Sequence, residues 1–253
     1  MLLQFASDLH LENPVNRDFV INGGLRALGE CLILAGDVAL LSDLHAFDWF
    51  WDWCEQHYRQ TWIVPGNHEF YGQAEASLSG DVLRLALRSN VEYLNNISVE
   101  YEGVHIVCTT LWSAIKDPCQ REIVQRQIAD YRCIRKAERA VTIEEINGLH
   151  ERSLAFLESS LNNVEPSKTV VVTHYVPIPE LTPQRYRTSE VKAAFIADCR
   201  DLVLKWRPAY WIYGHSHVSD RRCCFETCFV ANQLGTVRSN KTLNFNSGAV
   251  LKI

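Results

Sequence analysis

The 253-residue sequence has no uninterrupted apolar run of the roughly 18–20 residues that a membrane helix requires, so we predict no membrane span. It also has no charged and apolar leader followed by a small-residue cleavage site, and its nine cysteines are an odd number scattered along the chain. These absences argue against a secreted, disulfide-linked protein and predict a reducing, cytoplasmic location. Three cysteines cluster at Cys223, Cys224 and Cys228, but no second cluster stands at zinc-site spacing. We expect them to be buried apolar thiols on a pair of strands.

The sequence lacks a strong charge of either sign, with 25 Lys and Arg against 30 Asp and Glu. Such a chain is not drawn to duplex nucleic acid or to anionic membranes, so the expected partner is a small or locally bound substrate. Internal repeats and low-complexity linkers are absent too, and 47% hydrophobic residues suffice for one large core. We predict a single domain over residues 1–253, with a helical cap inserted at about 113–150. The polar part of this insertion, 116–139, reads by default as a solvated surface.

Short apolar runs alternate with longer segments of helical periodicity. The predicted strands are 2–6, 31–35, 61–64, 104–108, 169–173 and 209–213. The predicted helices are 43–58, 73–88, 142–161 and 189–206, the third of which starts with a capping box formed by Thr142 and Glu145. Because the apolar runs lack strict polar alternation, the strands should be covered on both faces. This pattern predicts an α/β layered fold.

Polar residues follow five of the predicted strands, at the point where each strand ends. Ligands of open α/β sheets bind in the crevice outside the carboxyl ends of the strands, so these residues should converge on one place. The five groups are Ser7–His10, Gly36–Asp37, Gly66–Glu69, His174 and Gly214–His217.

Each of these groups is weak evidence when it is taken alone, because a lone Asp-x-His often caps a helix and a Gly-Asp often makes a turn. Together they supply two aspartates, four histidines and one asparagine that can bind metals. This mixture of oxygen and imidazole donors suits two divalent ions such as Mn, Fe, Ni or Zn. Two such ions about 3.5–4 Å apart form a clamp for in-line displacement at phosphorus.

The order of these motifs resembles the calcineurin-like metallophosphoesterase superfamily, and the whole chain looks most like its small bacterial members. The motifs that carry the resemblance are Asp8-x-His10, Gly36-Asp37, Gly66-Asn67-His68-Glu69, His174 and Gly214-His215-x-His217. The resemblance implies a sandwich of two mixed β-sheets flanked by helices, with a dinuclear metal site at the strand ends. It also suggests that residues 223–233 and 248–253 help to build the second sheet.

The resemblance further implies a role for each matching residue. Asp8, His10 and His217 would hold one metal. Asn67, His174 and His215 would hold the other. Asp37 would bridge both ions, and His68 would be the general acid that protonates the leaving oxygen. A metal-activated hydroxide would attack phosphorus directly, without a covalent enzyme intermediate.

Other positions depart from better-known branches of the superfamily. Protein phosphatases place an acidic residue that orients the catalytic imidazole where this chain has Leu40, so Asp43 becomes the candidate substitute. An Asp-aromatic-Arg segment that is frequent in the small bacterial members matches Asp130-Tyr131-Arg132, in which Arg132 is a candidate phosphate contact. Glu69 is left with two interpretations, either orienting the loop or imidazole or simply starting a helix.

Three functions are compatible with this sequence. The leading prediction is a dinuclear phosphoesterase that acts on a phosphodiester or a phosphomonoester. A nuclease acting on single-stranded nucleic acid is the alternative, since Arg185, Arg187 and the basic insertion could contact such a strand. A non-catalytic scaffold is disfavoured because no ligand position has been lost. The aromatic stretch Trp49–Trp53 could be an interaction surface of such a scaffold, but its helical periodicity predicts that most of these side chains lie in the core.

Overall fold

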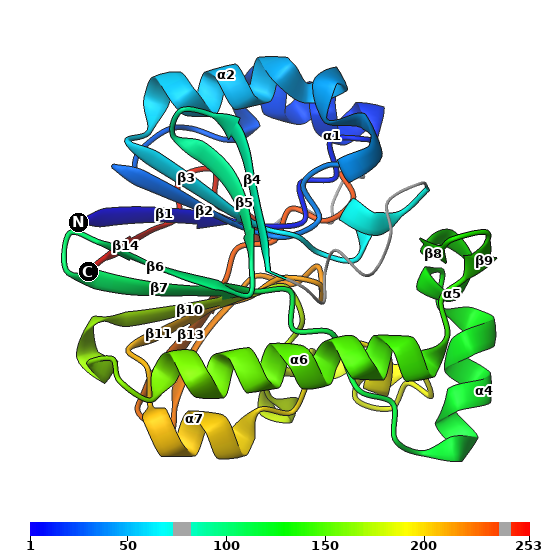
Figure 1. Ribbon diagram of the computed structural model, residues 1–253. Coiled ribbons are helices and arrows are strands. Elements are labelled where there is room, and N and C mark those ends of the chain that lie inside the picture. Colours follow the sequence, from blue (N-terminus) through cyan, green and yellow to red (C-terminus); the bar gives the residue numbers. More distant parts are fainter. Residues whose placement is uncertain (73–81, 238–243) are drawn as a thin grey trace.

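The computed structural model describes residues 1–72, 82–237 and 244–253 and contains two six-stranded mixed sheets packed face to face (Figure 1). The first sheet has the order β14 (Val250–Lys252), β1 (Leu2–Ala6), β2 (Cys31–Ala35), β3 (Gln60–Val64), β5 (Val91–Asn95) and β4 (Leu83–Arg88). Strands β1, β2, β3 and β5 run parallel, and the edge strands β14 and β4 are antiparallel to their neighbours.

The second sheet repeats this arrangement, with four parallel strands between two antiparallel edges. Its order is β12 (Asp220–Cys224), β13 (Thr227–Ala231), β11 (Tyr210–Ile212), β10 (Thr169–Thr173), β7 (Val104–Thr109) and β6 (Ile97–Tyr101). All six strands predicted from sequence are present, and the α/β class with two mixed sheets is confirmed.

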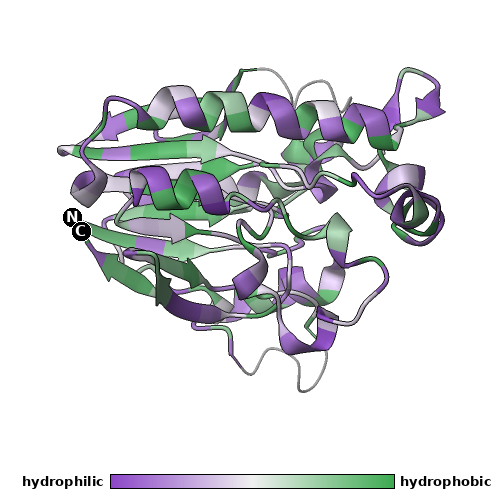
Figure 2. Ribbon diagram, turned by 90° about the horizontal axis from the view of Figure 1, so that it is seen from below, coloured by the Kyte–Doolittle hydropathy of each residue, from purple (hydrophilic) through white to green (hydrophobic). Residues whose placement is uncertain are grey.

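Strand alternation divides the core into layers. In β2, Cys31 and Ile33 point into the core between the sheets, whereas Leu32 and Leu34 pack outward. The outer face of the first sheet is covered by α2 (Asp48–His57), with α1 (Pro14–Phe19) nearby. The outer face of the second sheet is covered by α6 (Ile143–Leu161) and α7 (Arg200–Trp206). Figure 2 shows the strands mostly hydrophobic and α6 alternating between hydrophobic and hydrophilic residues, as a helix with one buried side should be.

Local signals explain where the main helices begin. Thr142 accepts from the Glu145 backbone N–H, and the Glu145 side chain accepts from the Thr142 N–H, so the predicted capping box starts α6. Helix α2 buries Phe50 and Trp51 from the predicted aromatic stretch, after a 3₁₀ helix at Leu41–Phe47. The predicted helices 142–161 and 43–58 are therefore confirmed, the latter with a 3₁₀ first turn.

The insertion between β7 and α6 contains α4 (Pro118–Gln127), α5 (Asp130–Cys133) and a small hairpin, β8 (Arg135–Lys136) with β9 (Arg139–Ala140). It lies beyond the end of the sandwich opposite the two termini (Figure 1). Tyr131 and Ile134 pack in one apolar cluster with Phe70 and Tyr175, which follow β3 and β10. The insertion is thus attached to the end of the sandwich where the parallel strands finish.

Two predicted helices are wrong in part. Residues 73–81 of the predicted helix 73–88 lie outside the described residues, and 83–88 form strand β4, in which Leu85 and Leu87 face the core while Arg84 and Arg88 alternate with them. In the predicted helix 189–206, only α7 is α-helical, after a short 3₁₀ turn. The backbone of 195–199 bonds instead to the loop after β10, with Val176 N–H donating to Phe195 and Ala197 N–H donating to Val176.

The C-terminal strands also differ from expectation. The predicted strand pair around Cys223 and Cys228 is β12 and β13 in the second sheet, but β14 pairs with β1 and therefore belongs to the first. The expected burial of the thiols is wrong, because Cys223 is exposed and Cys224 and Cys228 are only half-buried on this edge hairpin. Among the described residues, no helix is long and apolar enough to cross a membrane.

Candidate metal centre and active site

The five strand ends bring their polar side chains to one place, as the sequence predicts. The parallel strands of both sheets finish at the end of the sandwich that carries the insertion, so loops that are far apart in sequence meet there. Strand β1 delivers Asp8 and His10, β2 delivers Asp37, β3 delivers Asn67 and His68, β10 delivers His174, and β11 delivers His215 and His217.

The backbone that carries these side chains is unusual. Five residues have a positive φ, a conformation that costs free energy for any residue with a side chain. They are Asp8 (55°), His10 (45°), Asp37 (54°), His215 (70°) and His217 (49°). The glycines beside them allow close approach, since a Cβ on Gly36 would lie 2.3 Å from His174 Nδ1 and a Cβ on Gly66 2.2 Å from Asp37 Oδ1. Such strain concentrated at one site indicates a functional rather than a purely structural role.

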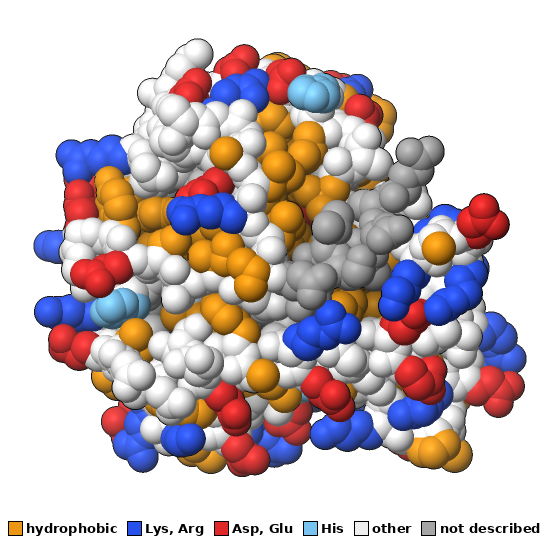
Figure 3. All heavy atoms as spheres, in the orientation of Figure 1, with side chains coloured by type: hydrophobic (Ala, Val, Ile, Leu, Met, Phe, Trp, Pro, Cys, Tyr) orange, Lys and Arg blue, Asp and Glu red, His pale blue; other side chains and the backbone are white. Residues whose placement is uncertain are grey.

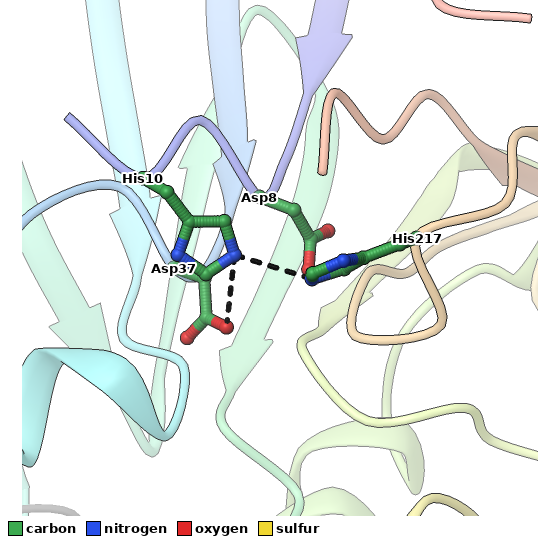
Figure 4. Close-up of side chains that lie close together, drawn as sticks. All are labelled: Asp8, His10, Asp37 and His217. Atoms are coloured by element: carbon green, nitrogen blue, oxygen red, sulfur yellow. Dashed lines mark hydrogen bonds and ion pairs between the residues drawn. The ribbon is translucent and has the colours of Figure 1, made fainter. Parts of the chain in front are cut away.

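One group of donor atoms consists of Asp8, His10, Asp37 and His217, whose ligand atoms all lie within 4.8 Å of one another (Figure 4). His10 Nε2 lies 3.7 Å from Asp37 Oδ2 and 3.2 Å from His217 Nε2. His217 Nε2 in turn lies 3.4 Å from Asp8 Oδ1. Two imidazole nitrogens and two carboxylates therefore converge on a single point.

A second group contains Asp37, His174 and His215. His174 Nε2 lies 3.4 Å from Asp37 Oδ1, 3.2 Å from His215 Nδ1 and 3.0 Å from the carbonyl oxygen of Asn67. Asp37 belongs to both groups and offers a different oxygen to each. The geometry thus contains two adjoining donor sets that share one carboxylate.

Hydrogen bonds to residues outside the two donor groups orient the donor atoms toward one another. His174 Nδ1 donates to the Ala35 carbonyl at 2.9 Å, which leaves Nε2 as the free donor atom. His10 Nδ1 contacts Glu12 Oε1 at 3.0 Å with the same effect. The Asn67 amide nitrogen donates to Asp130 at 2.8 Å, so that its carbonyl oxygen faces His174. Partners of this kind accompany metal-binding histidines, and the donor set fits divalent cations.

The electrostatics of the site favour positive charge. Burial alone would lower the pKa of His174 and His68, but the Asp37 carboxylate raises the first to about 10 and the second to about 9. Burial and the neighbouring His174 hold the pKa of His215 well below its usual range. Protons cannot occupy every ring, because charged imidazoles 3.2 Å apart repel each other. Divalent cations held by neutral rings would remove this repulsion.

His68 stands beside the two donor groups that share Asp37, in a further cluster with His10 and Glu12, at the start of the 3₁₀ turn His68–Phe70. Its Nδ1 lies 3.3 Å from Glu12 Oε1, and the Tyr71 ring stacks on it with centroids 4.3 Å apart. Burial alone would raise the pKa of Glu12, but the contacts with His10 and His68 lower it to about 2. Glu12 therefore takes the orienting position for which Asp43 was the candidate, and Asp43 is exposed. The spacing Asp8-x-His10-x-Glu12, with a polar residue at every second position, was the available signal.

The structure does not bring Arg132 to the other predicted site residues. Its side chain is exposed and donates to the Arg126 carbonyl at 2.8 Å, close to the end of α4. Asp130 of the same motif reaches the site instead. It is buried and accepts from Asn67 at 2.8 Å, from the Tyr71 hydroxyl at 2.6 Å and from the Tyr175 hydroxyl at 3.3 Å.

Glu69 is fully buried and ties two ligand-bearing loops together. One carboxylate oxygen accepts from the backbone N–H groups of Asp37 (2.9 Å) and Gly66 (2.8 Å). The other accepts from the Val38 N–H at 2.7 Å. Burial and the nearby Asp37 carboxylate raise the pKa of Glu69 to about 7. Apart from the Tyr93 hydroxyl, which donates to it at 3.3 Å, its hydrogen-bond partners belong to the loop backbone, which corresponds to the loop-orienting interpretation.

Replacing Glu69 by Gln should lower the free energy of unfolding by about 1–3 kcal/mol, because an amide NH₂ would then face buried N–H donors. Urea denaturation of the purified variant measures this loss. The control is Glu102→Gln, which removes an exposed carboxylate whose ion pair among the described residues is with the exposed Arg59, and it should change stability by less than about 1 kcal/mol. Equal stability of the two variants would contradict the loop-anchoring role.

A cavity of about 200 Å³ opens beside the donor groups. Asp37, His68 and His215 form its polar floor. One wall is aromatic, where the Tyr186 and Phe195 rings stack with centroids 5.4 Å apart. The insertion also contributes to the lining, through Ile128 to Asp130. The cavity is thus a small chamber between the donor atoms, the insertion and the loop after β10.

Comparison with known proteins is consistent with this site. The family model described as calcineurin-like phosphoesterase matches residues 5–219. An uncharacterised protein of Acanthamoeba polyphaga mimivirus is 27% identical over 278 residues, covering 100% of this chain and 96% of its own length. The crystal structure of phosphopantetheinyl hydrolase from Mycobacterium tuberculosis superposes with a TM-score of 0.65 at 18% identity, covering 92% of this chain and 89% of that one. At that identity, the likeness concerns the fold.

Proposed function

This chain belongs to the calcineurin-like phosphoesterase family, whose members are hydrolases of phosphoric esters, and from that premise we propose that it is a dinuclear metal-dependent phosphoesterase with a compact substrate. The observation that supports two ions rather than one is Asp37, whose two oxygens belong to two adjoining donor groups. Asp8, His10 and His217 would hold one ion, and Asn67, His174 and His215 the other, with Asp37 shared. Mn, Fe, Ni and Zn all suit these donors.

Bound ions would supply an activated water and polarise the phosphoryl oxygens. The protein's own residues then have three tasks. Asp37 and Asn67 fix the phosphoryl group's position by fixing the donor geometry, with Glu69 and Asp130 behind them. His68 lines the cavity and holds a proton for the leaving oxygen. Glu12 keeps this imidazole oriented and favours its charged form.

The cavity supports a small substrate over a nucleic acid strand. Its volume of about 200 Å³ accommodates a phosphoryl group with a compact organic part, and its described lining residues include no Lys or Arg. Arg185 lies beside the cavity, with its guanidinium 4.6 Å above the Tyr186 ring and a hydrogen bond to the Ser216 carbonyl, and it is a single positive charge rather than a stripe. On the face shown in Figure 3, basic and acidic side chains are intermixed and form no basic stripe. A strand of many phosphates would require such a stripe.

Protein loaded with Mn should hydrolyse an aryl phosphodiester or an aryl phosphomonoester, with a rate that changes little between low and moderate salt, and a chelator should abolish the activity. The measurement is a panel of monoesters, diesters, cyclic nucleotides and single-stranded DNA, assayed after metal analysis of the same sample. Cleavage of single-stranded DNA that falls steeply with salt would favour the nuclease instead. No turnover of any ester by fully metal-loaded protein would refute the proposed activity.

A further inference from the structure

The hairpin of β12 and β13 is closed by a two-residue turn in which Phe225 (φ 54°) and Glu226 (φ 66°) both have positive φ. Positive φ at both central residues defines a type I′ turn, the type whose twist matches that of the flanking strands. Such turns favour Asn and Gly, so Phe and Glu are held here in an unfavourable conformation. The hairpin therefore depends on its cross-strand pairs to stay closed.

The pairing places two thiols directly opposite each other. Cys224 is opposite Thr227 next to the turn, and Cys223 is opposite Cys228 one position further. In a hairpin with a two-residue loop, the pair next to the loop exchanges backbone hydrogen bonds. Cys223 and Cys228 are thus a non-hydrogen-bonded pair, in which the Cα atoms approach to about 4.5 Å and the side chains are closest.

The two sulfur atoms are already in contact, with Cys223 Sγ 2.7 Å from Cys228 Sγ. A Cα separation of about 4.5 Å falls inside the range of about 4.4–6.8 Å that disulfides span. Both residues are also accessible, since Cys223 is exposed and Cys228 half-buried. No backbone movement is needed to bring them within bonding distance.

We propose that Cys223 and Cys228 are an oxidation site at which a peroxide forms a reversible cross-strand disulfide. The thiolate of the more exposed Cys223 attacks the peroxide and gives a sulfenic acid and water. The Cys228 thiol then displaces that hydroxyl group, which gives the disulfide and a second water. Overall, two thiols and one hydrogen peroxide give one disulfide and two waters, and a dithiol reverses the change.

The location makes this bond relevant to the neighbouring loop. Strand β12 begins at Asp220, three residues after His217, and Gln233 just beyond β13 hydrogen-bonds with the Ser216 side chain at 3.1 Å. The hairpin thus supports the loop with His215 and His217 from both sides. The disulfide itself requires only the hairpin geometry, so the inference is independent of the proposed hydrolase activity.

Reduced full-length protein treated with a slight excess of hydrogen peroxide should lose about 2 Da and should then take up two alkyl groups fewer than untreated protein, and fragments cut after Glu226 should stay linked until a dithiol is added. Cys228→Ser should prevent the link and leave a sulfenic acid on Cys223 that a 1,3-dione reagent traps. Cys224→Ser and Cys119→Ser are the matched controls, and both should keep the link, because Cys224 faces away and Cys119 is exposed on α4. Linkage that depends on Cys224, or oxidation of Cys223 beyond the sulfenic acid without linkage, would overturn the proposal.

Discussion

Replacing Asp37 by Asn should empty both halves of the metal centre at once. The carboxylate presents Oδ2 to His10 at 3.7 Å and Oδ1 to His174 at 3.4 Å, so that an amide removes a negative charge and one oxygen donor from a position common to both groups. Loss of an outer partner of a metal ligand already costs about 10–100-fold in metal affinity. We therefore expect a loss of at least about 100-fold for this shared ligand, with hydrolysis falling accordingly.

Metal analysis of the purified variant, titrated with Mn, measures this effect separately from activity. Asp8→Asn is the matched comparison, because Asp8 belongs to only one donor group and should cost one ion rather than two. Circular dichroism checks that the variant is folded. An Asp37→Asn protein with normal content of both ions would remove the bridging role.

Replacing His68 by Ala is expected to give a different pattern, with slow turnover and normal metal content. The residue contacts Glu12 and lines the cavity but belongs to neither of the two donor groups that share Asp37. General acid catalysis contributes about 10²–10⁴-fold, and it matters most when the leaving alcohol is a poor leaving group. Hydrolysis of an alkyl ester should therefore fall by about that factor, and hydrolysis of a nitrophenyl ester much less.

The discriminating measurement for His68 is the dependence of the rate on the pKa of the leaving group, which should become steeper in the variant. His45→Ala provides the control, since its side chain is almost fully exposed and belongs to neither donor group. Equal losses for good and poor leaving groups would show that His68 positions the substrate and donates no proton. A loss of metal would indicate that it is a ligand.

The parts of the site that are local in sequence were predictable. Asp8, Asp37 and His174 each follow a buried strand within a few residues, and parallel strands necessarily bring such ends together. Periodicity predicted an α/β layered fold, but the division of the strands into two mixed sheets was predicted only through the family resemblance. Strand β4 shows the limit, since LRLALR fits alternation and a helical stretch alike until its pairing with β5 is known.

The outer contacts were not predictable for a different physical reason. Asp130 lies 63 positions from Asn67, and only the packing of the insertion against Phe70 and Tyr175 places the two side chains together. Arg132 was the candidate because the Asp-aromatic-Arg pattern of the resemblance suggested a phosphate contact, but its backbone position on α5 directs it to Arg126. Sequence patterns identify which residue types could contact a metal or a phosphate, whereas tertiary packing determines which of those side chains reach the site.

The contact between Asp130 and Asn67 also makes the insertion part of the binding equilibrium. Asp130 is held by the Tyr71 and Tyr175 hydroxyls as well, so the amide that faces the donor groups is supported by a segment with its own small core. Thermodynamic linkage is reciprocal, and whatever steadies Asn67 steadies the insertion by the same free energy. In the proposed dinuclear centre, a substitution in the small core of the insertion should therefore weaken metal binding as well as the packing of the insertion.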